Sequence, residues 1–302
     1  MRDGYKNIKN QESKMKILDG NKISSEILEE LKTKVENLKK LGKKICLGII
    51  LVGNRKDSEI YVNMKKKRCQ EIGILNHDVF LPENTSEEEV LKQVHLLNQN
   101  PEIDGILVQL PLPEHIDSEK VISHISLEKD ADGFHPENIG KLARGQLQET
   151  IIPCTPEGCM ELLDRYQIPI KGKEVVIVGK SNVVGLPMSL LFLHRNATVT
   201  VCHIHTQDLK EKTSRGDILI VACGQKELIT SLYVKEGAVV IDVGINHQED
   251  ETKKQGYKVV GDVNFDFVKE KCSYLTPVPG GVGPMTVAML LSHVVKLATK
   301  RM

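Results

Sequence analysis

The clearest indication of fold in this sequence is residues 174–187, which read Glu174-Val-Val-Ile-Val-Gly-Lys-Ser-Asn-Val-Val-Gly-Leu-Pro187. A buried strand that feeds a glycine turn and then a helix is the layout that holds a pyrophosphate at a helix N-terminus. The spacing is G-x-S-x-x-x-G-x-P and departs from the dinucleotide fingerprint G-x-G-x-x-G. Taken alone, the stretch therefore fits either a nucleotide site or an ordinary tight strand-to-helix turn.

The next predicted strand bears on which cofactor such a site would take. In NAD-binding folds this strand usually ends in an acid that binds the ribose 2′-hydroxyl. Here it ends in Val201-Cys-His203-Ile-His-Thr206, without an acid. Lys180 and the histidines can instead meet a 2′-phosphate, so we expect NADP, with NAD as the alternative.

Short apolar runs alternate with helical patterns along the whole chain, which predicts mostly parallel sheets covered by helices. We expect a helix that begins with Thr155 as its cap and Pro156 at its first position. The fold class that follows is α/β, with two lobes and the ligand in a cleft between them or at the carboxyl ends of strands. The predicted strands are 45–52, 77–81, 105–110, 174–178, 197–201, 217–221 and 238–242, and the last predicted helix is 283–300.

Composition limits the possible functions. The chain has 302 residues, enough for two domains, and a formal net charge of +0, so no overall field attracts nucleic acid or an anionic membrane. No apolar run is long enough to span a bilayer by this criterion. The seven cysteines are scattered without a C-x-x-C pair, which indicates buried thiols of a reducing, cytoplasmic compartment and no metal site. We interpret residues 1–14 as a disordered lead.

A tyrosine and a lysine four residues apart, Tyr61 and Lys65, would lie one turn apart on the same face of a helix. Ile60, Met64 and Ile72 fall on or beside that face, so we expect an apolar stripe there. A lysine at the edge of such a stripe can become an acid or a base, because desolvation disfavours its charge. The alternative is a lysine that extends from the helix edge into solvent and has no further role.

Three other segments contain prolines, glycines or polar side chains in positions that usually have a structural or functional reason. Residues 276–286, Thr-Pro-Val-Pro-Gly-Gly-Val-Gly-Pro-Met-Thr, let backbone approach a ligand closely and can hold a cis peptide bond, or else form a rigid hinge. Asp130 and Asp132 precede the glycine turn at Gly133, where most acids cap the chain. Gln109 lies in an apolar predicted strand, and a buried amide needs partners.

These segments, in this order, resemble the bifunctional methylenetetrahydrofolate dehydrogenase/cyclohydrolase family from Met15 to the C-terminus. The motifs that carry the resemblance are Tyr61-x-x-x-Lys65, residues 104–113, 129–134, 153–156 and 241–246, the Gly179 turn, and residues 260–263 and 276–286. The resemblance implies two reactions at one site. They are NADP-dependent oxidation of 5,10-methylenetetrahydrofolate to the methenyl cation, and hydrolysis of that cation to 10-formyltetrahydrofolate.

The resemblance also implies roles for single residues. Lys65 would activate water and handle protons, Gln109 would hydrogen-bond Lys65 and tune its protonation, and Tyr61 would pack by the folate. Asp132 would hold the amino edge of the pterin. The remaining implied contacts are Pro279, Gly280, Gly281 and Val282 to the folate, and Gly179, Lys180, Ser181, His203 and Ile245 to the nicotinamide cofactor.

The resemblance implies a division of the chain as well. Residues 15–150 plus 284–302 would form the catalytic, folate-binding domain, and residues 151–283 a Rossmann-like NADP-binding domain. A symmetric homodimer is expected, through a face that the sequence does not reveal.

Two departures and three alternatives accompany the resemblance. Many relatives have arginine at the position of Lys180 and serine at that of Ile204, which weakens the preference for NADP over NAD. The alternatives are a dehydrogenase without hydrolase activity, a different two-lobed dehydrogenase, and a catalytically silent folate-binding protein. The joint presence of Tyr61, Lys65, Gln109 and Asp132 argues against the first and the last.

Overall fold

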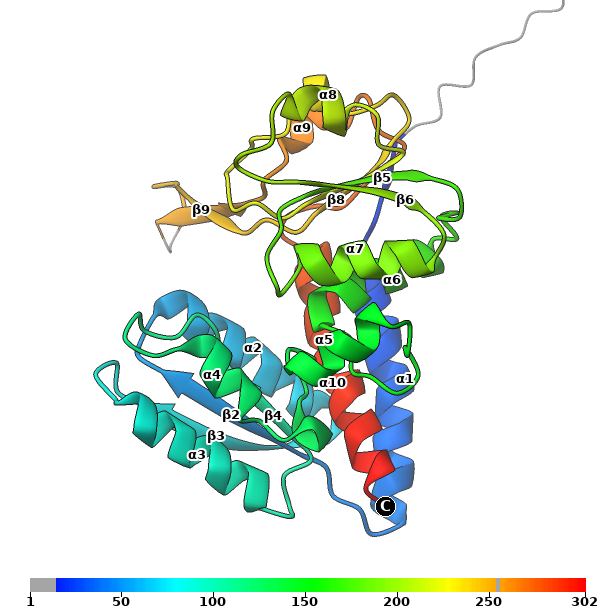
Figure 1. The fold of residues 1–302 in the computed structure, drawn as a ribbon. Helices are drawn as coiled ribbons and strands as arrows, with labels where there is room; N and C mark the ends of the chain where they lie inside the picture. Colours follow the sequence, from blue (N-terminus) through cyan, green and yellow to red (C-terminus); the bar gives the residue numbers. More distant parts are fainter. Residues whose placement is uncertain (1–14, 254–255) are drawn as a thin grey trace, which may run out of the picture.

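The computed structural model describes residues 15–253 and 256–302, so the expected lead at residues 1–14 lies outside the described part. Two α/β lobes are joined by a pair of long helices, α1 (Gly20–Lys40) and α10 (Val282–Lys300), which lie side by side (Figure 1). This arrangement confirms the predicted fold class.

The first lobe is built on a parallel sheet of three strands in the order β3-β2-β4. Every residue of β2 is buried, because helices cover both faces of the sheet. Leu47, Ile49 and Leu51 face the side of α1, α2 and α10, whereas Cys46 and Ile50 face the side of α3 and α4. The elements are α1 Gly20–Lys40, β2 Cys46–Val52, α2 Lys56–Ile72, β3 Leu75–Leu81, α3 Glu87–Gln99, β4 Gly105–Val108, α4 Ser118–Ser123, the 3-10 turn η1 Leu127–Lys129 and α5 Pro136–Ala143.

The second lobe contains a parallel sheet of six strands in the order β1-β11-β8-β7-β5-β6. The chain leaves β5 toward β6 on one side and later returns to β7 on the other, so the order reverses between β5 and β7. Ligands of open α/β sheets bind at such a reversal, outside the carboxyl ends of the strands. The elements are β5 Glu174–Val178, α7 Gly185–His194, β6 Thr198–Cys202, α8 Leu209–Thr213, β7 Ile218–Val221, the 3-10 turn η2 Ser231–Tyr233, β8 Val239–Asp242, α9 Phe265–Val268 and β11 Tyr274–Leu275.

Strand β1, Lys16–Ile17, pairs with β11 and so belongs to the sheet of the second lobe. We expected these residues in the first lobe, whose own chain instead begins with α1. A second unexpected feature is the antiparallel hairpin of β9, Asn246–Glu249, and β10, Tyr257–Val260. β9 is polar throughout, and β10 (Tyr-Lys-Val-Val) has only two adjacent aliphatic residues, so neither contains the longer apolar run by which the other strands were predicted.

Helix α6, Cys154–Arg165, and α10, Val282–Lys300, pack closely at the junction of the lobes. A Cβ at Gly158 would lie 2.9 Å from the Cβ of Met285, so only glycine permits this approach. The predicted cap at Thr155 is wrong, because α6 begins at Cys154 and the Thr155 hydroxyl lies 2.9 Å from the Thr286 hydroxyl. The Thr155 side chain in the first turn of α6 therefore contacts α10 and does not cap the backbone of its own helix.

Helix α10 has the length and composition of a membrane span, contrary to our expectation that no run is long enough. It is the one such helix in residues 15–253 and 256–302, and 67% of that stretch is buried inside the protein. Its packing against α1 and α6 accounts for its apolar character as that of a core helix.

Candidate active site

Lys65 lies on the buried side of α2, with only 8% of its surface exposed. Its ammonium donates a hydrogen bond to the side-chain oxygen of Gln109, at 3.0 Å. The expected apolar stripe is partly wrong: Ile60 and Met64 are 48% and 38% exposed, and Val62, Cys69 and Ile72 form the buried side. Lys65 is therefore a buried lysine next to core residues, and not a lysine that extends into solvent.

Gln109 lies one residue beyond β4, not inside a strand as expected. Its backbone N–H donates to the Ile50 carbonyl at 2.9 Å, and its side-chain NH₂ donates to the Leu110 carbonyl at 2.7 Å. Both contacts hold the amide so that its oxygen faces Lys65. The buried amide thus has the partners that its position requires.

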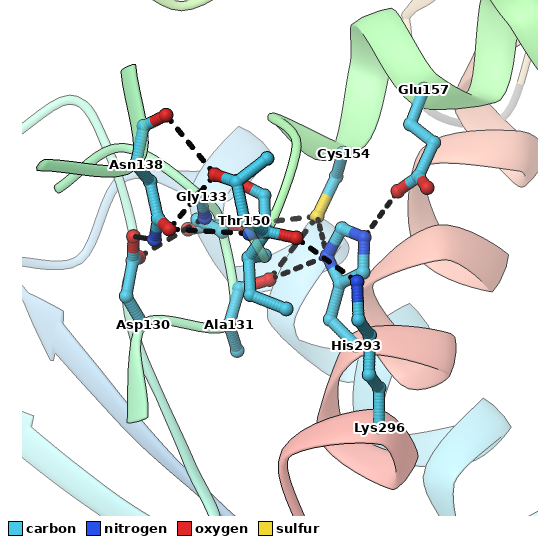
Figure 2. A network of polar contacts seen from close by, with 11 residues as sticks. Asp130, Ala131, Gly133, Asn138, Thr150, Cys154, Glu157, His293 and Lys296 are labelled. Atoms are coloured by element: carbon cyan, nitrogen blue, oxygen red, sulfur yellow. Dashed lines mark hydrogen bonds and ion pairs between the residues drawn. The ribbon is translucent and has the colours of Figure 1, made fainter. Parts of the chain in front are cut away.

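The two acids before the glycine turn have different surroundings. Asp130 accepts hydrogen bonds from the backbone N–H of Gly133 and the side chain of Asn138 (Figure 2). It also accepts from the backbone N–H of His135. Asp132 accepts the thiol of Cys154, over a long 3.8 Å. Asp130 therefore shapes the turn, and Asp132 retains accepting capacity for another group.

Burial raises the pKa of Asp132 to about 6, and the positive charge of Lys65 opposes this increase. The two groups therefore interact electrostatically across the end of β4. A carboxylate with a shifted pKa beside a buried lysine is typical of functional sites. Among the residues that the structure describes, no group of three or more potential metal ligands lies together.

An apolar cavity of about 340 Å³ lies between the lobes, next to this cluster. The expected folate contacts Tyr61 and residues 279–282 line it, and so does Ile245 from the second lobe. Ile60 and Met64 line it too, which explains why these apolar side chains are exposed. Lys65, Gln109 and Asp132 are not among its lining residues. Tyr61 lines the cavity and lies one turn before Lys65 on α2. It therefore links the cavity to the cluster that contains Lys65.

The peptide bond between Val278 and Pro279 is cis, as the sequence of residues 276–286 suggested. A second cis bond, between Leu110 and Pro111, was not predicted.

The Gly179 turn lies at the reversal point of the second sheet. Gly179 has a φ of 128°, and a Cβ there would lie 2.1 Å from the Ala222 carbonyl oxygen after β7. A Cβ at Gly185, the first residue of α7, would lie 2.1 Å from the Gly179 carbonyl oxygen. Only glycine fits at both positions of this turn. The turn therefore holds the Gly179 backbone close to the N-terminus of α7.

The other expected cofactor residues lie around this turn. Lys180 and Ser181 are exposed, and the Ser181 hydroxyl accepts from the Val184 N–H at 3.2 Å. His203 follows β6, and its Nδ1 accepts from the His205 N–H at 3.2 Å. Ile204 is 81% exposed beside it. These residues lie near the carboxyl ends of β5 and β6, whereas Ile245 lies in the cavity between the lobes.

Two aspartates of the second lobe form a network that we did not predict. Asp242 accepts from the N–H groups of Gly244, Asp262 and Val263, at 2.9 to 3.0 Å. Asp262 in turn accepts from the N–H groups of Cys223 and Gly224 and from the Asn246 side chain. The only sequence signal was the placement of each acid beside a glycine, in Asp-Val-Gly and Gly-Asp-Val.

Comparison with known proteins agrees with this geometry. The catalytic domain of tetrahydrofolate dehydrogenase/cyclohydrolase matches residues 18–132, and the NAD(P)-binding domain of the same family matches residues 153–302. The bifunctional protein FolD of Aquifex aeolicus is 54% identical over 281 residues, which cover 93% of this chain and 94% of that protein. Bifunctional protein FolD 2 of Arabidopsis thaliana is 52% identical with the same coverage.

Solved structures give the same result. The bifunctional enzyme FolD of Campylobacter jejuni superimposes with a TM-score of 0.91 and 49% identity, covering 95% of this chain and 100% of that chain. The FolD of Trypanosoma brucei, solved with NADP cofactor and an inhibitor, gives a TM-score of 0.91 at 39% identity, covering 95% and 98%. The chain belongs to the tetrahydrofolate dehydrogenase/cyclohydrolase family.

Proposed function

We propose that this protein oxidises 5,10-methylenetetrahydrofolate to the methenyl cation with NADP, and hydrolyses that cation to 10-formyltetrahydrofolate. The observation that carries the proposal is the contact of buried Lys65 with Gln109, one turn from Tyr61 and within electrostatic reach of Asp132. A dehydrogenase alone needs no proton-handling group at this position. Hydrolysis does, because a water must lose a proton as it attacks the cation.

The side chains divide this work by their chemistry. Lys65 is the group that exchanges protons with the attacking water and with the opening ring. Gln109 cannot titrate, and its fixed amide oxygen orients the lysine. Asp132 accepts hydrogen bonds from the amino edge of the pterin. Tyr61 and the backbone of residues 279–282 supply the apolar walls of the folate pocket.

The glycine turn after β5 fits a nicotinamide dinucleotide. Gly179 and Gly185 let the turn pack closely against the backbone at Ala222 and at Gly179, and exposed Lys180 and Ser181 lie near the N-terminus of α7. When bound, this cofactor accepts the hydride. Lys180 and His203 would hold the 2′-phosphate, and Ile245 would lie near the nicotinamide. NADP is the cofactor solved with the Trypanosoma brucei relative, which supports the same choice here.

We further propose a homodimer in the cytoplasm, with no nucleic-acid or membrane partner. The catalytic domain would comprise α1 to residue 150 plus residues 284–302, and residues 151–283 would form the cofactor domain together with β1. The balance of charge and the burial of α10 support the part of this proposal that concerns nucleic acid and membranes. Sedimentation of the purified protein tests the dimer, and a monomer at micromolar concentration would contradict it.

The central test follows reduced cofactor and the methenyl compound separately, starting from 5,10-methylenetetrahydrofolate. Lys65→Met is expected to lower hydrolysis by about a hundredfold or more, the contribution of a positioned acid or base. Lys67→Met is the matched control, since Lys67 is exposed on the same helix and should leave both rates unchanged. Full hydrolase activity in Lys65→Met would disprove the mechanism. A wild-type protein that accumulates methenyl compound would be the dehydrogenase without hydrolase activity.

The cofactor assignment has its own test. Lys180→Ala is expected to raise KM for NADP by about tenfold and to leave KM for NAD within twofold, because only NADP carries the phosphate. Equal turnover of the wild-type protein with NAD and NADP would contradict the assignment without affecting the folate chemistry.

A further inference from the structure

Behind Asp132, a buried histidine joins two helices to the loop that carries this acid. His293 of α10 is 3% exposed and lies between Glu157 of α6 and the backbone carbonyl of Ala131 (Figure 2). Its Nδ1 is 2.9 Å from the Ala131 oxygen, and its Nε2 contacts a carboxylate oxygen of Glu157. The roles proposed above do not use this pair.

The acceptors around the ring define what the histidine does. A carbonyl oxygen can only accept, so Nδ1 carries a hydrogen and donates it to Ala131. Nε2 faces a carboxylate oxygen of Glu157, which is also an acceptor, so Nε2 donates as well. Burial lowers the pKa of His293, but the Glu157 carboxylate and the Ala131 carbonyl outweigh it and raise the pKa overall. The ring is therefore a buried imidazolium with both hydrogens engaged.

Cys154 lies against the same ring, with Sγ 3.5 Å from Nδ1 of His293. A cysteine, a histidine and a glutamate in this order can form a nucleophilic site, in which the histidine takes the thiol proton. An imidazolium whose hydrogens are both engaged cannot take the thiol proton. Burial also raises the pKa of Cys154 well above its ordinary value. The cysteine is therefore a neutral thiol, which points at the Ala131 carbonyl at 3.5 Å and at Asp132 Oδ1 at 3.8 Å.

We propose that His293, held by Glu157, is a positioning residue that fixes the Ala131 carbonyl and thereby aims the Asp132 carboxylate at the folate. Ala131 directly precedes Asp132, so a rotation of its carbonyl would turn the acid. Close packing of α6 against α10 at Gly158 keeps the histidine and the glutamate together. The inference rests on the substrate-holding role proposed for Asp132.

The charged groups that face this pair come from each surrounding element. Lys296 of α10 donates to the Thr150 carbonyl at 3.0 Å, and Asp130 is engaged with backbone and Asn138 (Figure 2). Lys65 of α2 and the imidazolium of His293 both lower the pKa of Asp132, against the effect of burial. Loss of the imidazolium charge should therefore raise the pKa of Asp132, in addition to any change in its direction.

Two isosteric variants separate position from charge. The amide nitrogen of His293→Asn can take the place of Nδ1 and keep the donor to Ala131, whereas that of His293→Gln takes the place of Nε2 and loses it. In His293→Gln we expect KM for 5,10-methylenetetrahydrofolate to rise about fivefold with kcat within twofold, because one positioning hydrogen bond is lost. His293→Asn should restore KM to within twofold at pH 8. Both variants should move the acid limb of the pH profile of kcat/KM upward, since both lack the charge.

Combination with Asp132→Asn distinguishes this inference from the proposed function. If Asp132→Asn raises KM, and His293→Gln adds nothing to it, the positioning role is supported. An unchanged KM in His293→Gln, or an equal loss in His293→Asn and His293→Gln, would overturn it while the role of Asp132 stands. An unchanged KM in Asp132→Asn would instead disprove the proposed role of the acid. Should His293→Gln fail to fold, Glu157→Gln at the partly exposed end of the pair must still move the acid limb upward, and an unmoved limb would overturn the proposal.

Discussion

Each lobe places a pair of aspartates at a glycine turn near its sheet, and the two pairs are bonded differently. In the second lobe, Asp242 and Asp262 each accept three hydrogen bonds, mostly from backbone N–H groups. In the first lobe, Asp130 is bonded in the same way, but Asp132 is held by one long contact from a thiol. The difference separates acids that hold the fold together from an acid that remains available to a ligand.

The energetic consequence follows from hydrogen-bond accounting. A buried acceptor with three donors stabilises the native state, and its removal leaves those donors unpaired. A half-buried carboxylate without enough donors costs stability in the empty protein, and substrate can supply what is missing. The four aspartates should therefore respond to mutation in opposite ways.

The largest expected effect is on stability, from Asp262→Ala in the second lobe. The change leaves the N–H groups of Cys223 and Gly224 and the amide of Asn246 without their acceptor. We expect a loss of roughly 3–5 kcal/mol in the free energy of unfolding, measured by urea denaturation. Asp266→Ala is the control, because Asp266 is 82% exposed in its ion pair with Lys269 and its loss should leave stability nearly unchanged. Similar losses in both variants would contradict the structural role of Asp262.

The second effect is on catalysis, from Asp132→Asn. The amide keeps the size of the side chain but loses the charge that would accept from the pterin, which should lower kcat/KM by about 10- to 100-fold. Its unfolding free energy at pH 7 should equal or exceed that of the wild-type protein, since an under-bonded carboxylate is removed. Asp130→Asn should show the reverse pattern, with lower stability. If Asp132→Asn destabilises the protein as much as Asp262→Ala, the distinction between the two regions fails.

The sequence was sufficient to predict most of the fold, because its buried parallel strands are continuous apolar runs. It did not predict the hairpin β9–β10, whose strands are four residues long and either polar or only partly apolar, or the two-residue strand β1. Short or polar strands depend on partners that are distant along the chain, and no local pattern identifies them.

The candidate site was predictable in part for similar reasons. Tyr61 and Lys65 are one helical turn apart, so a local pattern places them together. Lys65 and Gln109 are 44 residues apart in the sequence, and only the family resemblance suggested that they are in contact. The pair of His293 and Glu157 spans 136 residues and was missed. Its one local sign was a histidine inside a largely apolar helix.

The third effect is a pH dependence. Because burial raises the pKa of Asp132 to about 6, the carboxylate should lose its charge as the pH falls through that value. KM for the folate is then expected to rise about tenfold between pH 7 and pH 5, the ratio of ionised fractions for one group. The change should be absent in Asp132→Asn, which serves as the control. A flat KM in the wild-type protein would show that the acid does not contact substrate as a carboxylate.

The same shift predicts the sign of a stability change. Between the ordinary value of 3.8 and about 6, the native state binds more protons at Asp132 than the unfolded state does. The contribution of Asp132 to the free energy of unfolding of the empty protein should therefore be fully present below pH 3.8. It should fall as the pH rises from there to about 6. Comparison of the wild-type protein with Asp132→Asn isolates this slope, and an identical slope in both would contradict the shift.

The smallest effect is expected at Cys154, whose thiol is the weak donor to Asp132. Cys154→Ser retains a donor and Cys154→Ala removes it, so we expect kcat/KM within twofold for serine and a two- to threefold loss for alanine. Burial and a raised pKa also make this thiol unreactive, so iodoacetamide should label it far more slowly than the half-buried Cys223. A large loss of activity in both variants would mean that Asp132 depends on the sulfur itself. The acid of the first lobe would then be as firmly held as those of the second, and its availability to substrate would need another explanation.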